Sequence, residues 1–359
     1  MNQPINLFEY ESLAPEHLSK MALDYYNSGA WDEITLRDNR AAYDRYKLLP
    51  RVLADVTHRD LSTTILGVPT EMPVLIAPMA FQCLAHPEGE MAVARAAKSM
   101  GVTTILSTMS TTSMEEVAGA TDKLWFQLYV HRDRSLTRAL VERAEAAGYS
   151  ALCLTVDAPV LGRRERDRRN QFFLPSGMEL ANLTFMADLE VAKSEGESGL
   201  FAYFARQLDP GITWKDLEWL QSLTKVPVVV KGVLRGDDAL RAVEHGAKAI
   251  VVSNHGGRQL DGAIATIDAL GEVVAAVGDR AEVLVDGGIR RGTDILKAIA
   301  LGAKAVLVGR PILWGLAAGG ETGARHVLEL LRDELDVGMA LSGCAKIEEI
   351  DVSLVRRSL

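Results

Sequence analysis

The chain has 359 residues, of which 48% are hydrophobic and 24% are charged, an ordinary composition for a globular enzyme. Its net charge of −9 argues against a general nucleic-acid-binding protein, because such proteins usually carry a basic excess. Three scattered cysteines lack the spacing of zinc sites or disulfide frameworks, so we expect packing residues and no bound metal. The sequence has no apolar run of roughly eighteen residues and no pattern typical of a secretion signal, so we expect a cytoplasmic protein without a membrane partner.

The amino-terminal part, residues 1–70, is expected to be helical. Apolar residues recur at helical spacing between Pro15 and Ser28 and predict one amphipathic helix there. From residue 71 to 320, short apolar runs alternate with alanine-rich amphipathic stretches, and residues 321–359 are expected to be helical again. The predicted strands are Pro73–Ala77, Thr103–Leu106, Leu124–Leu128, Ala151–Val156, Val226–Val230, Ala249–Val252, Glu282–Val285 and Ala305–Val308. The predicted helices include Glu88–Met100, Leu136–Ala147, Asp237–His245 and Gly292–Leu301.

Strands that are apolar throughout, alternating with helices, predict an α/β protein with a closed (β/α)8 TIM barrel. An open doubly wound sheet is the alternative, but it usually carries a glycine-rich fingerprint after its first strand, where this chain has Pro78-Met79-Ala80. Residues 162–212, after the fourth strand, form a long insertion that we interpret as a lid or as a passive surface loop. Nothing indicates a second domain, so residues 1–359 are expected to form one.

The most specific pattern is the decapeptide SNHGGRQLDG at residues 253–262, directly after a predicted strand. It places His255, a proton acceptor, three residues before Arg258, a fixed cation with bidentate geometry. This pairing suits the abstraction of a proton from an anionic substrate.

Polar groups also gather at the carboxyl ends of the other predicted strands, where barrel enzymes have their active sites. The set is consistent with a large heteroaromatic cofactor held by many donors and acceptors. After the last two strands, residues 286–290 and 309–310 predict a phosphate site, the alternative being tight turns with solvated arginines. Lys231 ends a buried strand and would stabilise negative charge on such a cofactor when it is reduced; a Schiff-base lysine and a structural ion pair are the alternatives.

The decapeptide resembles the active-site signature of the FMN-dependent L-2-hydroxy-acid oxidases, the family of glycolate and lactate oxidase. The resemblance extends from Tyr25-Tyr26 to the Leu341–Cys344 segment and implies FMN as cofactor and a homotetramer. The implied FMN-binding residues are Pro78, Met79, Ala80, Ser107, Gln127, Thr155, Lys231, Ser253, Asp286, Gly287, Gly288, Arg290, Gly309 and Arg310. The implied substrate-binding residues are Tyr25, Tyr129, Arg164, His255 and Arg258.

The chemistry of these side chains suggests their roles. Arg258 and Arg164 would clamp a carboxylate, Tyr129 and Tyr25 would hydrogen-bond the substrate, and His255 would accept a proton. Asp157 would stabilise the imidazolium, so that His255, Asp157, Tyr129, Arg258 and Lys231 form the expected catalytic set. For single residues other interpretations stay open: Tyr25 as a core aromatic, Asp157 as a helix cap and Arg164 as part of a solvated arginine face.

Departures from the plant glycolate-oxidase pattern bear on the substrate. Met109 stands where that pattern has tryptophan, Met79 where it has threonine, and Phe204 is expected to face the same pocket. We expect L-lactate to be preferred over glycolate, as in bacterial lactate-oxidase branches. The alternative is that these are substitutions of core residues without effect on substrate preference. Ala80 resembles the oxidase members, which favours O2 as acceptor and H2O2 as product over a quinone or a cytochrome. Two further alternatives are a flavin-binding barrel without turnover and an NAD-dependent barrel with a phosphorylated substrate.

Overall fold

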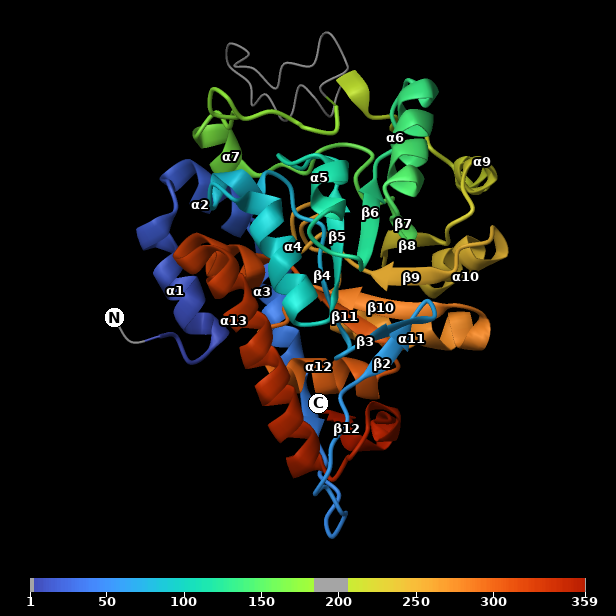
Figure 1. The fold of residues 1–359 in the computed structure, drawn as a ribbon. Helices are drawn as coiled ribbons and strands as arrows, with labels where there is room; N and C mark the ends of the chain where they lie inside the picture. Colours follow the sequence, from blue (N-terminus) through green and yellow to red (C-terminus); the bar gives the residue numbers. More distant parts are fainter. Residues whose placement is uncertain (1–2, 184–205, 359) are drawn as a thin grey trace.

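The computed structural model describes residues 3–183 and 206–358, and within them eight parallel strands close a barrel in the order β10-β11-β4-β5-β6-β7-β8-β9 (Figure 1). The predicted (β/α)8 barrel is therefore confirmed, and the open sheet is wrong. The strands are β4 (Val74–Ile76), β5 (Thr103–Ser107), β6 (Leu124–Leu128), β7 (Ala151–Thr155), β8 (Val228–Val233), β9 (Ala249–Val252), β10 (Glu282–Asp286) and β11 (Ala305–Val308).

The barrel strands are apolar on both faces because both faces are buried. One set of side chains fills the barrel interior around Trp125, which is only 1% exposed, and includes Ile105, Val229 and Leu284. The alternate side chains pack outward against the helices, so that each strand lies in a continuous core.

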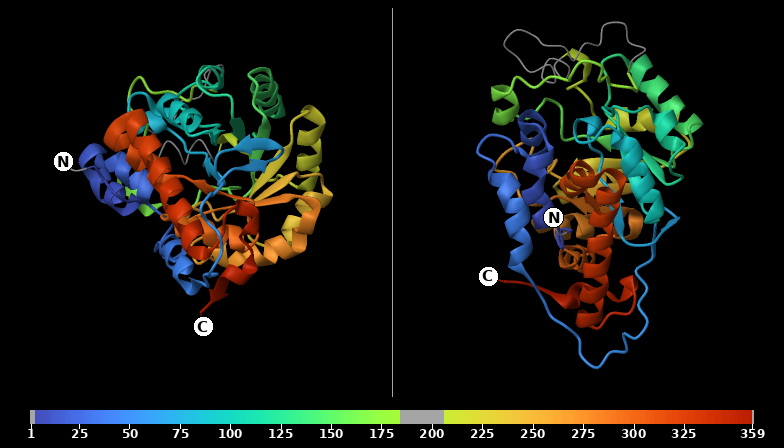
Figure 2. Two further views of the ribbon diagram at one scale, coloured as in Figure 1. Left: turned by 60° about the horizontal axis from the view of Figure 1, so that its bottom comes forward. Right: turned by 60° about the vertical axis from the view of Figure 1, so that its left-hand side comes forward.

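Helices surround the barrel and pack on its outer face (Figures 1 and 2). They are α4 (Gly89–Ser99), α5 (Met114–Ala118), α6 (Arg134–Ala146), α9 (Trp214–Leu223), α10 (Gly236–Glu244), α11 (Thr266–Val277), α12 (Gly292–Ala300) and α13 (Arg310–Ser342). Short 310 helices lie at η2 (Gln82–Leu84), η3 (Gly278–Arg280), η4 (Ile347–Glu349) and η5 (Val352–Leu354). Within the described ranges, none of the helices is both long enough and apolar enough to cross a bilayer.

The amino-terminal segment differs from the prediction in two ways. Leu18 has extended backbone angles and Ser19 caps a new helix by accepting a hydrogen bond from the Ala22 amide, so the single helix predicted over Pro15–Ser28 is wrong. The chain forms α1 (Leu7–His17), α2 (Lys20–Asn27), α3 (Ile34–Ala41) and η1 (Ala42–Arg45) instead. Of these, α1 and α2 pack against α13 (Figure 2), and the Tyr10 hydroxyl of α1 is 2.8 Å from Nδ1 of His326.

After Arg45 the helical expectation for residues 1–70 fails, because three short strands follow: β1 (Tyr46–Leu48), β2 (Thr63–Ile65) and β3 (Val68–Thr70). β2 and β3 form a hairpin whose Ile65 packs on the side chains that fill the barrel interior. β1 pairs antiparallel with β12 (Val355–Arg357), so the last predicted helical segment, 321–359, also ends in a strand.

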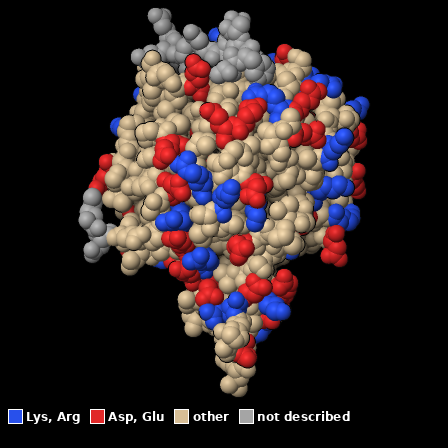
Figure 3. Space-filling view, in the orientation of Figure 1, with Lys and Arg blue, Asp and Glu red and all other residues tan. Residues whose placement is uncertain are grey.

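Two remaining features concern the insertion and the surface. The predicted insertion at residues 162–212 contains α7 (Glu165–Arg169), but residues 184–205, with Phe204, lie outside the described residues. Acidic and basic side chains are interspersed on the face drawn in Figure 3. Among the described residues, ion pairs are common, for example between Arg59 and Asp336 at 2.7 Å.

Candidate active site

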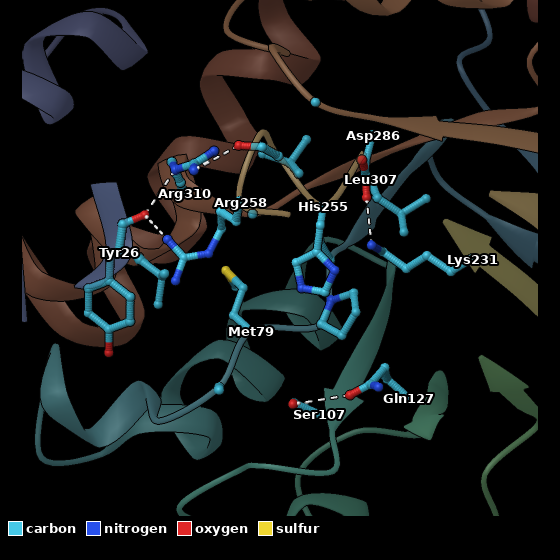
Figure 4. A pocket seen from close by; sticks show the side chains of 18 of the residues that line it. Tyr26, Met79, Ser107, Gln127, Lys231, His255, Arg258, Asp286, Leu307 and Arg310 are labelled. Atoms are coloured by element: carbon cyan, nitrogen blue, oxygen red, sulfur yellow. Dashed lines mark hydrogen bonds and ion pairs between the residues drawn. The ribbon is translucent and has the colours of Figure 1, made fainter. Parts of the chain in front are cut away.

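A pocket opens at the carboxyl end of the barrel, and residues at the ends of all eight strands line it together with α2 and the loop before α7 (Figure 4). It brings together every predicted site residue in the described ranges except Asp157 and Ser253. These two do not line the pocket but bind residues that do: Asp157 pairs with His255, and Ser253 accepts a hydrogen bond from Lys231. The ring of polar strand ends expected from the sequence is therefore a single pocket.

His255 points into this pocket from the loop after β9 (Figure 4). Its Nδ1 lies 2.9 Å from Oδ1 of Asp157, which leaves Nε2 as the ring nitrogen available to a ligand. Burial lowers the pKa of His255, and the Asp157 carboxylate opposes that effect. Burial would raise the pKa of Asp157, but the His255 contact holds it below its usual range. Asp157 is thus an ionised partner of His255, and the helix-cap interpretation is wrong.

Glycines next to His255 allow a left-handed backbone in this loop, and another glycine leaves space for Asp157. His255 itself has a φ of 59°, and the following Gly256 and Gly257 have φ of 64° and 75°. A Cβ on Gly257 would lie 2.6 Å from the amide nitrogen of Leu36, and one on Gly232 would lie 2.6 Å from Cγ of Asp157. Gly232 was missed in the sequence, although it directly follows Lys231.

Two guanidinium groups lie at one wall of the pocket. Arg258 donates from Nη1 to the carbonyl oxygens of Tyr25 at 2.6 Å and Ser28 at 2.9 Å, and its Cζ lies 5.0 Å from the Tyr25 ring centre. Arg164 is 5% exposed, so the solvated interpretation is wrong; burial and the nearby Arg258 lower its pKa to about 10. The buried Arg164 and the partly buried Arg258 together favour a carboxylate between them and the base.

Two tyrosines accompany these cations. The Tyr25 ring stacks on Phe172 with centres 4.4 Å apart, so this residue is both a core aromatic and a pocket residue. Burial raises the pKa of both Tyr25 and Tyr129, which keeps each phenol protonated and able to donate a hydrogen bond.

Lys231 lies at the opposite side of the pocket in a buried network. Its Nζ is 3.1 Å from Oδ2 of Asp286 and 3.0 Å from Oγ of Ser253. Burial would lower the pKa of Lys231, but the carboxylates of Asp286 and Asp157 hold it above its usual value. A protonated, ion-paired amine is a poor nucleophile, so the Schiff-base alternative does not fit. The other oxygen of Asp286, Oδ1, is buried without a hydrogen-bond donor among the described residues, and it could accept from a ligand hydroxyl.

The ends of β10 and β11 hold two further arginines that are partly buried. Arg310 donates to the carbonyl oxygens of Tyr26 and Gly256, each at 2.9 Å, and no carboxylate in the described residues pairs with it. Burial, with Arg258 and Arg290 nearby, holds the pKa of Arg310 well below its usual value. The Arg290 guanidinium stacks 4.6 Å from the Trp314 ring centre. These arginines are not solvated; they form a cationic corner suited to a phosphate.

The whole set fits FMN. Arg290 and Arg310 with Gly309 would hold the phosphate, Asp286 the ribityl chain, and Lys231 the electron-rich edge of the ring. Gln127 completes the polar wall, donating to Thr155 Oγ1 at 3.1 Å and accepting from Ser107 Oγ at 3.2 Å. Sequence reasoning missed several apolar residues of the lining and Tyr26, for which the neighbouring Tyr25 was the available signal; the missed residues are Tyr26, Ala77, Gly256, Leu307, Val308, Pro311 and Leu313.

The barrel and the pocket together define a flavin-dependent oxidoreductase, with a histidine base beside two arginines that can bind a carboxylate. Residues 14–357 match the family described as FMN-dependent dehydrogenase, and the chain belongs to that family, with FMN as its cofactor. This assignment overturns the NAD-dependent alternative.

Named relatives match the chain along almost its full length. It is 66% identical over 360 residues to L-lactate oxidase of Nostoc sp., with 99% of each chain covered. It is 51% identical to 2-hydroxyacid oxidase 1 of Homo sapiens, over 98% of this chain and 96% of the relative. A crystal structure of mandelate oxidase with (S)-4-hydroxymandelic acid superposes with a TM-score of 0.94 at 45% identity, covering 98% of each chain.

Proposed function

We propose that this protein oxidises a small L-2-hydroxy acid to the 2-oxo acid, with L-lactate preferred over glycolate, and reduces O2 to H2O2. The observation that carries the proposal is the Asp157-supported His255 facing a pocket that also holds Arg164 and Arg258. FMN, when bound, supplies the acceptor for the two electrons of the oxidation and passes them to O2.

The side chains divide the remaining work. Arg258 and Arg164 bind the substrate carboxylate, and Tyr129 and Tyr25 donate hydrogen bonds to the carboxylate or the hydroxyl. His255 accepts the released proton at Nε2, and Asp157 stabilises the resulting imidazolium. The fixed ammonium of Lys231 stabilises negative charge on the cofactor.

Substrate preference rests on two methionines. Met79 and Met109 both line the pocket and are 9% and 3% exposed, and they present flexible apolar surface to the substituent on the reacting carbon. The lactate oxidase from Nostoc, at 66% identity, supports a methyl-bearing substrate. A methyl group discriminates by only about 1–3 kcal/mol, so glycolate should remain a slower substrate.

The acceptor, cellular location and assembly form the last part of the proposal. Ala80 lines the pocket, and the relatives from Nostoc and Homo sapiens are named as oxidases, which supports O2 as the acceptor. Three free cysteines are in keeping with a reducing compartment such as the cytoplasm. We further propose that residues 1–359 act as one domain and assemble as a homotetramer.

The test is anaerobic mixing of the FMN-loaded protein with L-lactate and, separately, glycolate, while the visible absorbance of the flavin is followed. Faster bleaching with L-lactate, then prompt recovery and H2O2 on admitting air, is the expected result. Bleaching without recovery in air would replace O2 with a quinone or protein acceptor. A flavin that neither substrate bleaches would contradict the proposed activity.

A further inference from the structure

Asp167 on α7 is a buried carboxylate to which the proposed chemistry assigns no role. It is 4% exposed, and neither of its oxygens has a hydrogen-bond donor within the described part of the chain. Burial raises the pKa of Asp167, and the nearby cations Arg258 and Arg164 oppose that effect. Without such cations, burying an ionised carboxylate that lacks donors would be costly. The nearest is Arg164, whose Nη1 lies 3.9 Å from Oδ2 of Asp167.

The other charged groups that face Asp167 have closer partners of their own. Arg166 binds Glu33 at 2.6 Å. Asp24 pairs with Lys20 and accepts a hydrogen bond from Asn170 at 2.8 Å. Arg258 donates to backbone carbonyl groups of α2 and its carboxyl end. Within the described residues, by contrast, Arg164 makes one long hydrogen bond, from Nε to the Arg258 carbonyl oxygen at 3.4 Å.

We propose that Asp167 is a positioning residue that holds the Arg164 guanidinium at the pocket wall and offsets one of the two adjacent arginine charges. The inference rests on the proposed function, in which Arg164 binds the substrate carboxylate. Burial lowers the pKa of Arg164, and repulsion by the nearby Arg258 lowers it further. A carboxylate three residues along the chain from Arg164 stabilises it without occupying the substrate position. When a substrate carboxylate binds, two cations then face two anions, and the buried site is neutral.

The Asp167→Asn variant tests this role because it keeps the side-chain shape and removes the charge. Arg164 would bind the carboxylate equally in the ground and transition states, so losing its orientation raises KM rather than lowering kcat. We expect KM for L-lactate to rise about tenfold or more with kcat within about threefold of the wild type. The Kd for pyruvate, read from perturbation of the flavin absorbance, should rise by the same factor. Asp167→Glu, which restores the charge, should recover part of both losses.

Two further variants make the test specific. Glu165→Gln removes a carboxylate from the exposed side of the same helix, 57% exposed, and should leave KM and the pyruvate Kd unchanged. In an Arg164→Met background, Asp167→Asn should change KM by less than about twofold, since the group through which it acts is gone. If Asp167→Asn alone does not fold, the double variant should, because it removes both buried charges.

The contrary outcomes are distinct. A folded, FMN-loaded Asp167→Asn protein with unchanged KM and pyruvate Kd would overturn the inference, as would equal losses in kcat and kcat/KM. A double variant that fails to fold would also overturn it. A wild-type protein that binds pyruvate but is not reduced by L-lactate or glycolate would instead count against the proposed function, and the pyruvate Kd would still report on Asp167.

Discussion

Nδ1 of His255 lies 2.9 Å from Oδ1 of Asp157, although the two residues are 98 positions apart and follow different strands. The contact orients the ring, places the tautomeric proton on Nδ1 and leaves Nε2 to accept a proton from the substrate. Several properties of the enzyme should depend on this one contact and on the buried charges around it.

Asp157→Asn should lower kcat by a factor of about 10²–10⁴, because the imidazolium formed during turnover loses its counter-ion. His255 accepts a proton only when it is neutral, and burial lowers its pKa. In the wild-type enzyme, kcat/KM should therefore fall only as the pH drops below the usual His value of 6.5. Asp157 opposes this lowering, so its removal should move the acid limb to still lower pH. Stopped-flow flavin reduction across the acid range measures both effects; an acid limb that moved to higher pH would contradict the assignment.

Lys231→Met should lower the free energy of unfolding by about 3–5 kcal/mol, because the Asp286 carboxylate stays buried without its ammonium partner. Urea denaturation of the apoprotein measures the loss. The double variant Lys231→Met/Asp286→Asn should lose less, since both charges leave together. Arg235→Gln, which breaks an exposed pair with Asp237, is the control and should leave the denaturation midpoint in place.

Arg310→Met should weaken FMN binding by roughly 10–100-fold, the effect of losing one charge-assisted contact to a phosphate. The change in FMN fluorescence on binding to apoprotein measures the Kd. At saturating FMN, KM for L-lactate should remain close to the wild-type value, because the proposed role of Arg310 is to hold the phosphate, although its guanidinium and that of Arg258 both donate to the Ser28 carbonyl oxygen. A raised KM with unchanged FMN affinity would show that Arg310 binds the substrate rather than the phosphate.

Met109→Trp should shift preference from L-lactate toward glycolate, because a bulkier wall leaves less space for the methyl group. The ratio of the two kcat/KM values should change by about 10–100-fold. Val337→Thr, on the exposed surface of α13, provides a control and should leave the ratio unchanged. An unchanged ratio in Met109→Trp would favour the interpretation of this methionine as a neutral core residue.

The barrel could be predicted because buried parallel strands leave a continuous apolar signature; three strands, such as Leu124–Leu128, have the predicted bounds. The break at Leu18 and the short strands β1 to β3 could not, since three-residue strands carry no periodicity and the pairing of Tyr46 with Arg357 joins distant parts of the chain. For the site, most pocket residues could be predicted because they stand at the carboxyl ends of the predicted strands. The space that Gly232 leaves for Asp157 and the burial of Asp167 depend on packing between segments far apart in sequence.

The carbonyl groups at the end of α2 receive their hydrogen-bond donors from Arg258 and Arg310, which lie more than 200 residues further along the chain. On the ribosome these carbonyls therefore emerge long before the guanidinium groups that bind them. These carbonyl groups therefore cannot receive those donors until Arg310, the first residue of α13, has left the exit tunnel. The first helices of the chain thus depend on one of its last segments for these hydrogen bonds, which join two parts of the pocket wall.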